Sequence, residues 1–458
     1  MDQKIIDKIK EIVDPKYVLT KEMELLLYSY DAFLDKQKPD VVVLPSTTEE
    51  ISKIVKLCYE NNISVVGRGS GTNLSGGTIP TRGGVMLHFS RMINILDVDF
   101  ENLTVTVEPG IFTLDLQNFV ASKGFAYVPD PSSQKVSTMG GNVCENSGGA
   151  HCLKYGTTTN HVRGLEIVLN DGTIINTGGK AQDYPGYDLT GIMTGSEGTL
   201  GIITKIILNL MKPVEAINTM MAVYDSIVDA ANTVSAIISD GIIPACLEMM
   251  DNTVMRAVDA ALKMGYPLDA AGILIIELDG MPEGLSEKAQ KIVEICKKNN
   301  AKDIKVPKDA AERMAIWGGR KGAFGAMGQI RPAYLVCDGT VPRTKLPEVL
   351  AKVEAISKEF KLPIGNVFHA GDGNLHPLIL FDERDKDEKQ RTLAASTAIL
   401  KACADVGGTI SGEHGVGIEK LKEIAFIFSK DDLQFARKLK KAFDPTDIVN
   451  PDKMIPAA

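Results

Sequence analysis

The sequence predicts an α+β fold with two main domains. A chain of 458 residues is too long for one ordinary hydrophobic core. Glycines and short strand signals dominate before Lys212–Pro213, whereas longer amphipathic helices alternate with strands after it. We therefore expect a helical lead-in over 1–35, a first domain over 36–215 and a second over 216–458, whose tail (440–458) returns towards the first.

The expected elements of the first domain follow one another closely. Thr47–Glu50 matches a capping box, and apolar residues at helical spacing continue the helix to Asn61–Asn62. A second helix is expected from Thr113 to Gly124. The turn sequence Asn170-Asp171-Gly172 predicts a hairpin between 165–169 and 173–176. The other predicted strands are Ile63–Val66, Val85–Phe89, Asn94–Asp97 and Leu103–Val107.

The second domain is expected to contain an antiparallel sheet flanked by helices. Its beginning predicts strand, helix and strand over Met220–Tyr224, Ile227–Ile238 and Ala245–Met249.

Composition excludes several classes of function. A net charge of −9 argues against a nucleic-acid partner, because phosphate binding requires a basic surface. Seven scattered cysteines without a C-x-x-C pair indicate reduced thiols and no iron–sulfur or zinc cluster. The N-terminus lacks the apolar run of a signal peptide, and no stretch has the ~18 apolar residues of a membrane helix. These features predict a cytoplasmic protein.

A glycine-rich loop, Gly67–Gly77, directly follows a predicted strand. Its glycines allow successive backbone N–H groups to point into one concavity, which suits a diphosphate. Gly76, Gly77 and Pro80 prevent the helix that a Rossmann fingerprint requires, and no Lys-Ser/Thr follows as in a Walker loop. An ordinary surface loop remains the alternative at this point.

Further paired glycines follow in the same domain, at Gly140-Gly141, Gly148-Gly149 and Gly198–Gly201. With the first loop, they indicate close backbone approach to a flat ligand. In order and spacing these segments resemble the FAD-binding domain of the vanillyl-alcohol oxidase / para-cresol methylhydroxylase (PCMH) family, and within it the D-lactate dehydrogenase and glycolate oxidase D-subunit branch. The resemblance spans nearly the whole chain. It implies a two-part PCMH-type domain, with pyrophosphate on the first loop and flavin against the later segments.

Some members of that family attach flavin covalently through a histidine in or near these loops. No histidine lies in 67–77, and His151 and His161 come later, so we expect non-covalent FAD. The residues expected to bind it are Gly67, Arg68, Gly69, Ser70, Gly71, Thr72, Asn73, Ser75, Gly76, Pro129, Asp130, Thr138, Gly140, Gly141, Asn142, Ser147, Gly148, Gly149, Tyr155, Gly156, Glu197, Gly198, Gly201, Ile202 and Asn450.

Two histidines flank a glycine-containing turn in the second domain. If Gly371–Asn374 forms the turn, hairpin pairing places His369 directly opposite His376, with Cβ atoms roughly 4.5–5.5 Å apart. Two imidazoles on one face suit a single metal ion. The alternative is a histidine pair hydrogen-bonded to carboxylates such as Asp372. Ser411–Gly417 offers a third ligand, because it contains adjacent Glu413 and His414.

The resemblance assigns roles to these residues. It implies that His369, His376 and Glu413 bind a divalent metal, which in relatives is zinc, manganese or iron, and that His414 is the adjacent base. It also points to Arg320 for a substrate carboxylate, since an arginine fork binds carboxylates bidentately. Lys321 fits an exposed helix face, and Arg331 is a weaker candidate.

Together these features predict FAD- and metal-dependent oxidation of a small 2-hydroxy acid. Lactate, oxidised to pyruvate, is the favoured substrate, and glycolate and 2-hydroxyglutarate are the alternatives. The resemblance extends to lactate dehydrogenases that pair with a two-subunit electron-transferring flavoprotein and couple to NAD by electron bifurcation with ferredoxin; a quinone or oxygen could serve instead. Two rival functions are a non-redox flavoprotein of the ether-lipid synthase type and a flavin subunit that only relays electrons.

Overall fold

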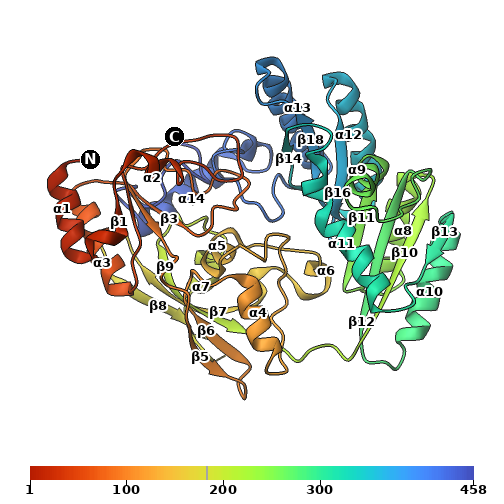
Figure 1. The fold of residues 1–458 in the computed structure, drawn as a ribbon, viewed down its shortest axis with the longest axis horizontal. Coiled ribbons are helices and arrows are strands. Elements are labelled where there is room, and N and C mark those ends of the chain that lie inside the picture. Colours follow the sequence, from red (N-terminus) through yellow and green to blue (C-terminus); the bar gives the residue numbers. More distant parts are fainter. Residues whose placement is uncertain (182–183, 458) are drawn as a thin grey trace. The chain divides into compact units, whose positions relative to one another are not determined.

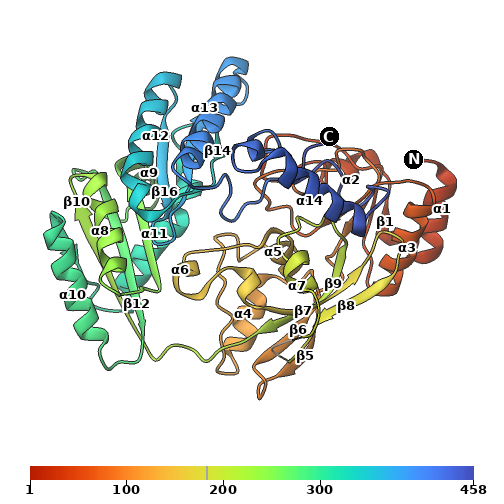
Figure 2. The ribbon, with the colours of Figure 1, turned by 180° about the vertical axis from the view of Figure 1, so that it is seen from behind.

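The computed structural model describes residues 1–181 and 184–457, which form two compact units. Unit 1 comprises Met1–Gly148, Gly156–Pro213 and Glu413–Ala458, and unit 2 comprises Gly149–Tyr155 and Val214–Gly412. Each unit combines helices with its own sheets, so the predicted α+β class is confirmed (Figures 1 and 2).

The first sheet of unit 1 has the strand order β1-β2-β4-β3, and its central strand β4 pairs in parallel with β2 and β3. Helices α1 and α3 share its hydrophobic core. Thr47 caps α3 as predicted, because its side chain accepts the Glu50 N–H. The elements are α1 (Gln3–Ile12), β1 (Val18–Leu19), α2 (Glu22–Leu26), β2 (Val41–Val43), α3 (Thr48–Glu60), β3 (Val65–Arg68) and β4 (Val85–His88).

The second sheet of unit 1 is antiparallel, with the order β5-β6-β9-β7-β8. It includes the predicted hairpin, in which Val168 pairs with Ile174. Residues of α4 and α5 belong to the core on this sheet. The elements are β5 (Ile95–Asp99), β6 (Thr104–Val107), α4 (Thr113–Ala121), α5 (Met139–Glu145), β7 (Val162–Val168), β8 (Ile174–Gly178), α7 (Leu189–Met193) and β9 (Ile202–Asn209).

Unit 2 is built on an antiparallel sheet that includes the path β13-β10-β12-β11-β16-β17-β15, with β14 and β18 attached through β16. The short helix α6 (Cys152–Tyr155) also belongs to unit 2. The strands are β10 (Ala216–Tyr224), β11 (Cys246–Asp251), β12 (Gly272–Gly280), β13 (Asp303–Lys305), β14 (Ala333–Val336), β15 (Gly339–Thr340), β16 (Ile364–His369), β17 (Asn374–Leu375) and β18 (Pro377–Phe381).

Helices cover both faces of this sheet. A Cβ on Gly272 would meet Ile227 of α8, whereas Glu277, five residues further along the same strand, bonds to Arg313 of α11. Side chains an odd number of positions apart point to opposite faces, so α8 and α11 lie on opposite sides. The helices are α8 (Ile227–Ser239), α9 (Asn252–Leu262), α10 (Leu285–Lys298), α11 (Ala310–Met327), α12 (Leu346–Phe360) and α13 (Lys386–Asp405).

The C-terminal segment makes its contacts with unit 1. The sequence places residues 413–458 in the second domain, with 440–458 returning towards the first, and in the structure the whole segment clusters with unit 1. Backbone bonds join Val65 of β3 to Ile448 and Asn450. Lys440 of α14 (Lys430–Phe443) donates to the Thr199 carbonyl at 2.7 Å. These bonds satisfy polar groups of unit 1 that the first 213 residues leave open.

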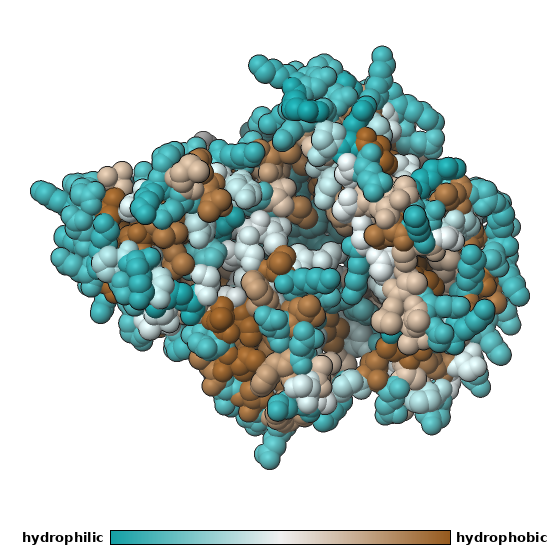
Figure 3. Space-filling view, viewed as in Figure 1, coloured by the Kyte–Doolittle hydropathy of each residue, from teal (hydrophilic) through white to brown (hydrophobic). Residues whose placement is uncertain are grey.

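The molecular surface is polar over much of unit 2. Hydrophilic side chains gather over the region of α12 and α13 in the view of Figure 3, and α12 carries the ion pairs Glu348–Lys352 and Glu354–Lys358. None of the helices in the described ranges is both long enough and apolar enough to cross a bilayer.

Candidate active site

A cavity in unit 1 brings the separate glycine segments together. Its walls come from β3 and the following loop, from α5 and from the start of β9. The predicted FAD-binding residues that line it are Gly67, Arg68, Gly69, Gly140, Gly141, Glu197, Gly198, Gly201, Ile202 and Asn450. The other residues of its wall are Gly77, Thr78, Phe89, Pro109, Cys144, Glu145 and Ile203.

Close backbone packing explains why glycine occupies this wall. A Cβ on Gly69 would lie 2.1 Å from the Thr138 hydroxyl oxygen, so only glycine fits without movement. The same Thr138 caps α5, because its hydroxyl accepts the Gly141 N–H. The first glycine loop and the beginning of α5 therefore touch, and their backbone groups face one cavity that suits a flat ligand with a diphosphate.

The remaining predicted FAD-binding residues lie outside the cavity wall. Ser70, Gly71, Thr72, Asn73, Ser75 and Gly76 continue the loop after β3, where Asn73 accepts the N–H groups of Ser75 and Gly77. Pro129 and Asp130 follow α4, and Ser147, Gly148 and Gly156 follow α5. The Asn142 amide is buried against Thr113. Gly149 and Tyr155 belong to unit 2, where the Tyr155 hydroxyl donates to Asp279.

Two carboxylates, Glu145 and Glu197, line the cavity. Burial raises the pKa of Glu145 well above its ordinary value, and the neighbouring Glu197 raises it further. Burial also raises the pKa of Glu197, although the N–H groups of Val416 and Gly417 and two lysines oppose that shift. Backbone N–H groups thus favour the charged form of Glu197, whereas the charge of Glu197 disfavours the charged form of Glu145.

The predicted base, His414, lies on a segment that is fixed to the glycine loop of unit 1. Ser75 donates its hydroxyl to the His414 carbonyl at 2.9 Å, and Glu197 accepts from Val416 and Gly417 at 2.7 Å. A Cβ on Gly415 would lie 2.7 Å from a Glu145 oxygen. Hydrogen bonds at the His414 carbonyl and at the two residues Val416 and Gly417 thus hold the backbone of this segment.

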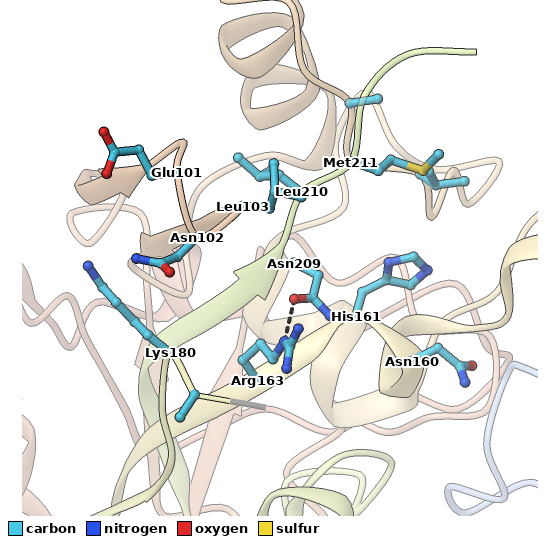
Figure 4. A pocket seen from close by; sticks show the side chains of 13 residues that line it. Glu101, Asn102, Leu103, Asn160, His161, Arg163, Lys180, Asn209, Leu210 and Met211 are labelled. Carbon is cyan, nitrogen blue, oxygen red and sulfur yellow. Dashed lines mark hydrogen bonds between the residues drawn. The ribbon is translucent and has the colours of Figure 1, made fainter. Parts of the chain in front are cut away.

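No histidine lines the glycine cavity within the described residues. His161 lines a different cavity of unit 1, where Arg163 donates to Asn209 (Figure 4). The ring of His161 lies 5.9 Å from that of Tyr127. His151 belongs to unit 2 and faces Glu277.

The histidine hairpin of unit 2 differs from the prediction in its register. His369 pairs with Asn374 and not with His376. Ala370–Gly373 forms the turn, since Gly373 adopts φ +81° and Asp372 accepts the Asn374 N–H. The turn lies one residue earlier than predicted, so the partner of His369 shifts by two residues. His376 becomes a diagonal neighbour on the same face, with ring centroids 5.2 Å apart.

Both histidines have a fully buried carboxylate beside them. Nδ1 of His369 lies 2.6 Å from Oε1 of Glu248, and Nε2 of His376 lies 3.5 Å from Oδ1 of Asp338. A carboxylate only accepts hydrogen bonds, so Nδ1 of His369 carries the proton and the lone pair of the neutral ring lies on Nε2. The predicted alternative, a histidine pair bonded to carboxylates, is thus present in part: His369 hydrogen-bonds Glu248, and His376 lies at ion-pair distance from Asp338.

The predicted substrate arginine also contacts Glu248. Arg320 of α11 is 3% exposed, and its Nε donates to Oε2 of Glu248 at 2.7 Å. Lys321 is exposed, as its predicted surface position requires, and Arg331 lies beside Glu388. Unit 2 therefore gathers Arg320, His369 and His376 near one another, and leaves Lys321 and Arg331 outside this group.

Asp338 holds the backbone directly before the next predicted site residue, Glu413. It accepts the Ser411 hydroxyl at 2.6 Å and the Gly412 N–H at 3.0 Å. Glu413 follows directly in the sequence and belongs to unit 1. Sequence reasoning missed Asp338 and Glu248; the signal for Glu248 was a charged residue inside the apolar strand Ala245–Met249.

Comparison with known proteins gives the family. Residues 39–178 match the FAD binding domain model, and residues 214–454 match the model of FAD linked oxidases, C-terminal domain. The chain belongs to the FAD-linked oxidases. The second match begins at 214, where the main stretch of unit 2 also begins.

Relatives of this FAD-linked oxidase include hydroxy-acid enzymes. The glycolate oxidase subunit GlcD of Bacillus subtilis (strain 168) is 46% identical over 94% of this chain and 92% of its own length. The D-lactate dehydrogenase of Anaerostipes hadrus is 32% identical over 98% and 97%, respectively. The family and these relatives support an FAD-dependent oxidoreductase acting on hydroxy acids.

A solved structure confirms the fold. p-Cresol methylhydroxylase with substrate bound has a TM-score of 0.84 at 18% identity, covering 99% of this chain and 97% of that one. At this low identity the likeness concerns the architecture alone, and it confirms the predicted PCMH-type fold.

Proposed function

We propose that this FAD-linked oxidase is a metal-dependent dehydrogenase that oxidises lactate to pyruvate. The observation that carries the proposal is the buried group of Arg320, His369 and His376 around Glu248. It joins a carboxylate-binding cation to two metal-binding imidazoles, and a 2-hydroxy acid presents a carboxylate beside a hydroxyl. The D-lactate dehydrogenase relatives support this substrate.

The donor set in unit 2 fits a divalent cation. Two imidazoles share one face, and two fully buried carboxylates, Glu248 and Asp338, accompany one buried guanidinium. A cation of charge two would offset this excess of negative charge. We propose His369 and His376 as ligands of iron, zinc or manganese. Glu413, which directly follows Gly412, remains the third ligand that the family resemblance predicts.

Each residue then has one task. Arg320 would hold the substrate carboxylate, since two of its N–H groups face Glu248 and others remain available. His414 would accept the hydroxyl proton as the general base. When bound, the metal acidifies an oxygen that it ligates, and FAD takes up the two electrons. The glycine cavity of unit 1 would bind FAD without a covalent bond.

Electrons must then leave the chain. Neither an NAD fingerprint nor a cluster motif is present in the sequence. We propose a separate acceptor protein, a two-subunit electron-transferring flavoprotein of the bifurcating kind, in a reducing compartment such as the cytoplasm. All seven cysteines lie in the described ranges and none of them forms a disulfide, which supports such a compartment.

Glycolate is the second candidate substrate. The glycolate oxidase subunit of Bacillus subtilis is 46% identical, against 32% for the D-lactate dehydrogenase of Anaerostipes hadrus. Glycolate lacks only the methyl group of lactate, so Arg320 and the histidines would treat both alike. Anaerobic flavin reduction by lactate enantiomers, glycolate and 2-hydroxyglutarate, with each metal added, ranks the substrates.

The base is tested with His414→Ala. We expect flavin reduction by lactate to slow by roughly 10²–10⁴-fold, the usual contribution of a general base, while FAD content stays unchanged. His161→Ala is the control, because His161 lines another cavity. A wild-type rate of flavin reduction in His414→Ala would refute the base assignment. If no 2-hydroxy acid bleached the wild-type flavin, the proposed function itself would be wrong.

A further inference from the structure

A buried carboxylate at the centre of unit 2 contacts two residues with different proposed tasks. Glu248 of β11 is fully buried, and its neighbours along the strand, Leu247 and Met249, are apolar. Its Oε1 lies 2.6 Å from Nδ1 of His369, and its Oε2 accepts from Nε of Arg320 at 2.7 Å. A single side chain thus binds both a predicted metal ligand and the predicted substrate arginine.

The backbone makes this contact rigid. Glu248 and His369 are direct cross-strand partners in the β11–β16 ladder, so the positions of their Cα atoms are fixed by the sheet. Arg320 reaches the same carboxylate from α11, and it is 3% exposed. Three elements therefore meet at one carboxylate, and none of these side chains can turn without breaking a buried charged hydrogen bond.

A neighbouring pair shows that stability alone does not explain the arrangement. Glu277 on β12 binds Arg313, which lies two turns before Arg320 on α11, and also accepts from Trp317 and Thr219. Nε2 of His151 also lies 3.6 Å from Oε1 of Glu277. A fully buried ion pair adds little net stability over apolar packing, because desolvation offsets the attraction. Glu248 differs because its histidine partner, His369, lies beside a second histidine, His376, so that two imidazoles can share one metal, whereas the ring of His151 stacks on Trp317.

We propose that Glu248 is a positioning residue that orients His369 and Arg320 together. This inference rests on the proposed function. By accepting the Nδ1 proton, Glu248 fixes the tautomer in which Nε2 of His369 can bind a metal. By holding one edge of the guanidinium, it leaves the remaining N–H groups of Arg320 directed at a substrate carboxylate. Metal and carboxylate recognition are thereby tied to one another through a group that touches neither.

The test compares Glu248→Gln with the matched variant Glu277→Gln. Glutamine keeps the shape, but its amide offers a donor to Nδ1 of His369 and so favours the wrong tautomer. We expect Glu248→Gln to keep FAD, to bind metal at least tenfold more weakly by equilibrium dialysis, and to bind oxalate at least tenfold more weakly by flavin absorbance. Glu277→Gln should leave both affinities within about twofold of the wild type.

A double-mutant cycle with Arg320→Lys separates positioning from a general loss of structure. If Glu248 acts through Arg320, Arg320→Lys weakens oxalate binding much less in the Glu248→Gln background than in the wild type. Full additivity, or equal metal and oxalate affinities in Glu248→Gln and wild type, would overturn the inference. If the wild-type protein bound metal but its flavin were not reduced by 2-hydroxy acids, the proposed function would be refuted. The positioning role could still be tested, because metal and oxalate affinities do not depend on turnover.

Should Glu248→Gln fail to fold, Glu248→Asp provides the same comparison. Aspartate keeps the charge but is one methylene shorter, so it can hold only one of its two partners. We expect Glu248→Asp to lose one affinity, for metal or for oxalate, at least tenfold more than the other. Equal losses of both affinities would contradict the positioning role.

Discussion

The two units recognise their proposed ligands by different chemical means. Unit 1 exposes backbone: glycines line its cavity, and at Gly69 even one added carbon would meet Thr138. Unit 2 relies on buried side chains, in which Glu248 and Asp338 accompany two histidines and an arginine. Backbone recognition suits a cofactor that is held throughout, whereas side chains can exchange protons and discriminate substrates. Changes to side chains in unit 2 should therefore remove chemistry, and changes to backbone freedom in unit 1 should remove the cofactor.

The largest expected effect is that of His369→Gln. Loss of an imidazole ligand should remove the metal, which supplies several kcal/mol of charge stabilisation, so kcat/KM for lactate should fall by roughly a thousandfold or more. FAD content should not change. Metal analysis and steady-state kinetics measure this, with His151→Gln as the control because His151 faces Glu277. Retention of metal at the wild-type level would remove His369 from the proposed ligand set.

A smaller effect is expected for Gly69→Ala in unit 1. The new Cβ would force Thr138 and the start of α5 to move, at a cost of about 1–3 kcal/mol. We expect FAD affinity to fall roughly ten- to a hundredfold in fluorescence titrations, while metal binding is retained. Gly325→Ala is the control, since a Cβ there meets nothing within 4 Å. Unchanged FAD affinity in Gly69→Ala would show that the cavity does not bind the cofactor.

The smallest effect concerns stability and not ligands. Burial raises the pKa of Glu277, but hydrogen bonds from His151, Arg313 and other donors outweigh burial and lower it to about 2. A depressed pKa stabilises the folded state above the unfolded pKa of about 4.5, and this stability is lost as pH falls towards 2. Between pH 7 and 3.5 about 1.4 kcal/mol should be lost.

Urea unfolding at both pH values checks this expectation. In Glu277→Gln this part of the pH dependence should disappear, because glutamine does not titrate. An equal loss of stability in the wild type and the variant would mean that the Glu277 carboxylate is not specifically stabilised.

Local patterns predicted most of the fold. Turn and capping residues, such as Asn170-Asp171-Gly172 and Thr47, identified elements that depend on neighbours in sequence. Glycine spacing indicated the residues of one cavity, because each segment carries its own backbone signal. The predicted register of the histidine hairpin was wrong, because the register depends on which residues form the turn. Gly371 and Gly373 are each compatible with a turn, so the sequence does not decide between the two positions. Glu248 was missed because its role depends on contacts with residues of β16 and α11, which are far away in the sequence.

The division of unit 1 into separate stretches has a consequence for synthesis. Its strand β3 forms backbone hydrogen bonds with Ile448 and Asn450, and Glu197 accepts the N–H groups of Val416 and Gly417. The main stretch of unit 2, Val214–Gly412, emerges from the ribosome as one continuous run before those partners exist. Unit 2 can therefore fold while the ribosome is still translating, whereas the first-made half of the protein must wait for the last-made residues to complete it.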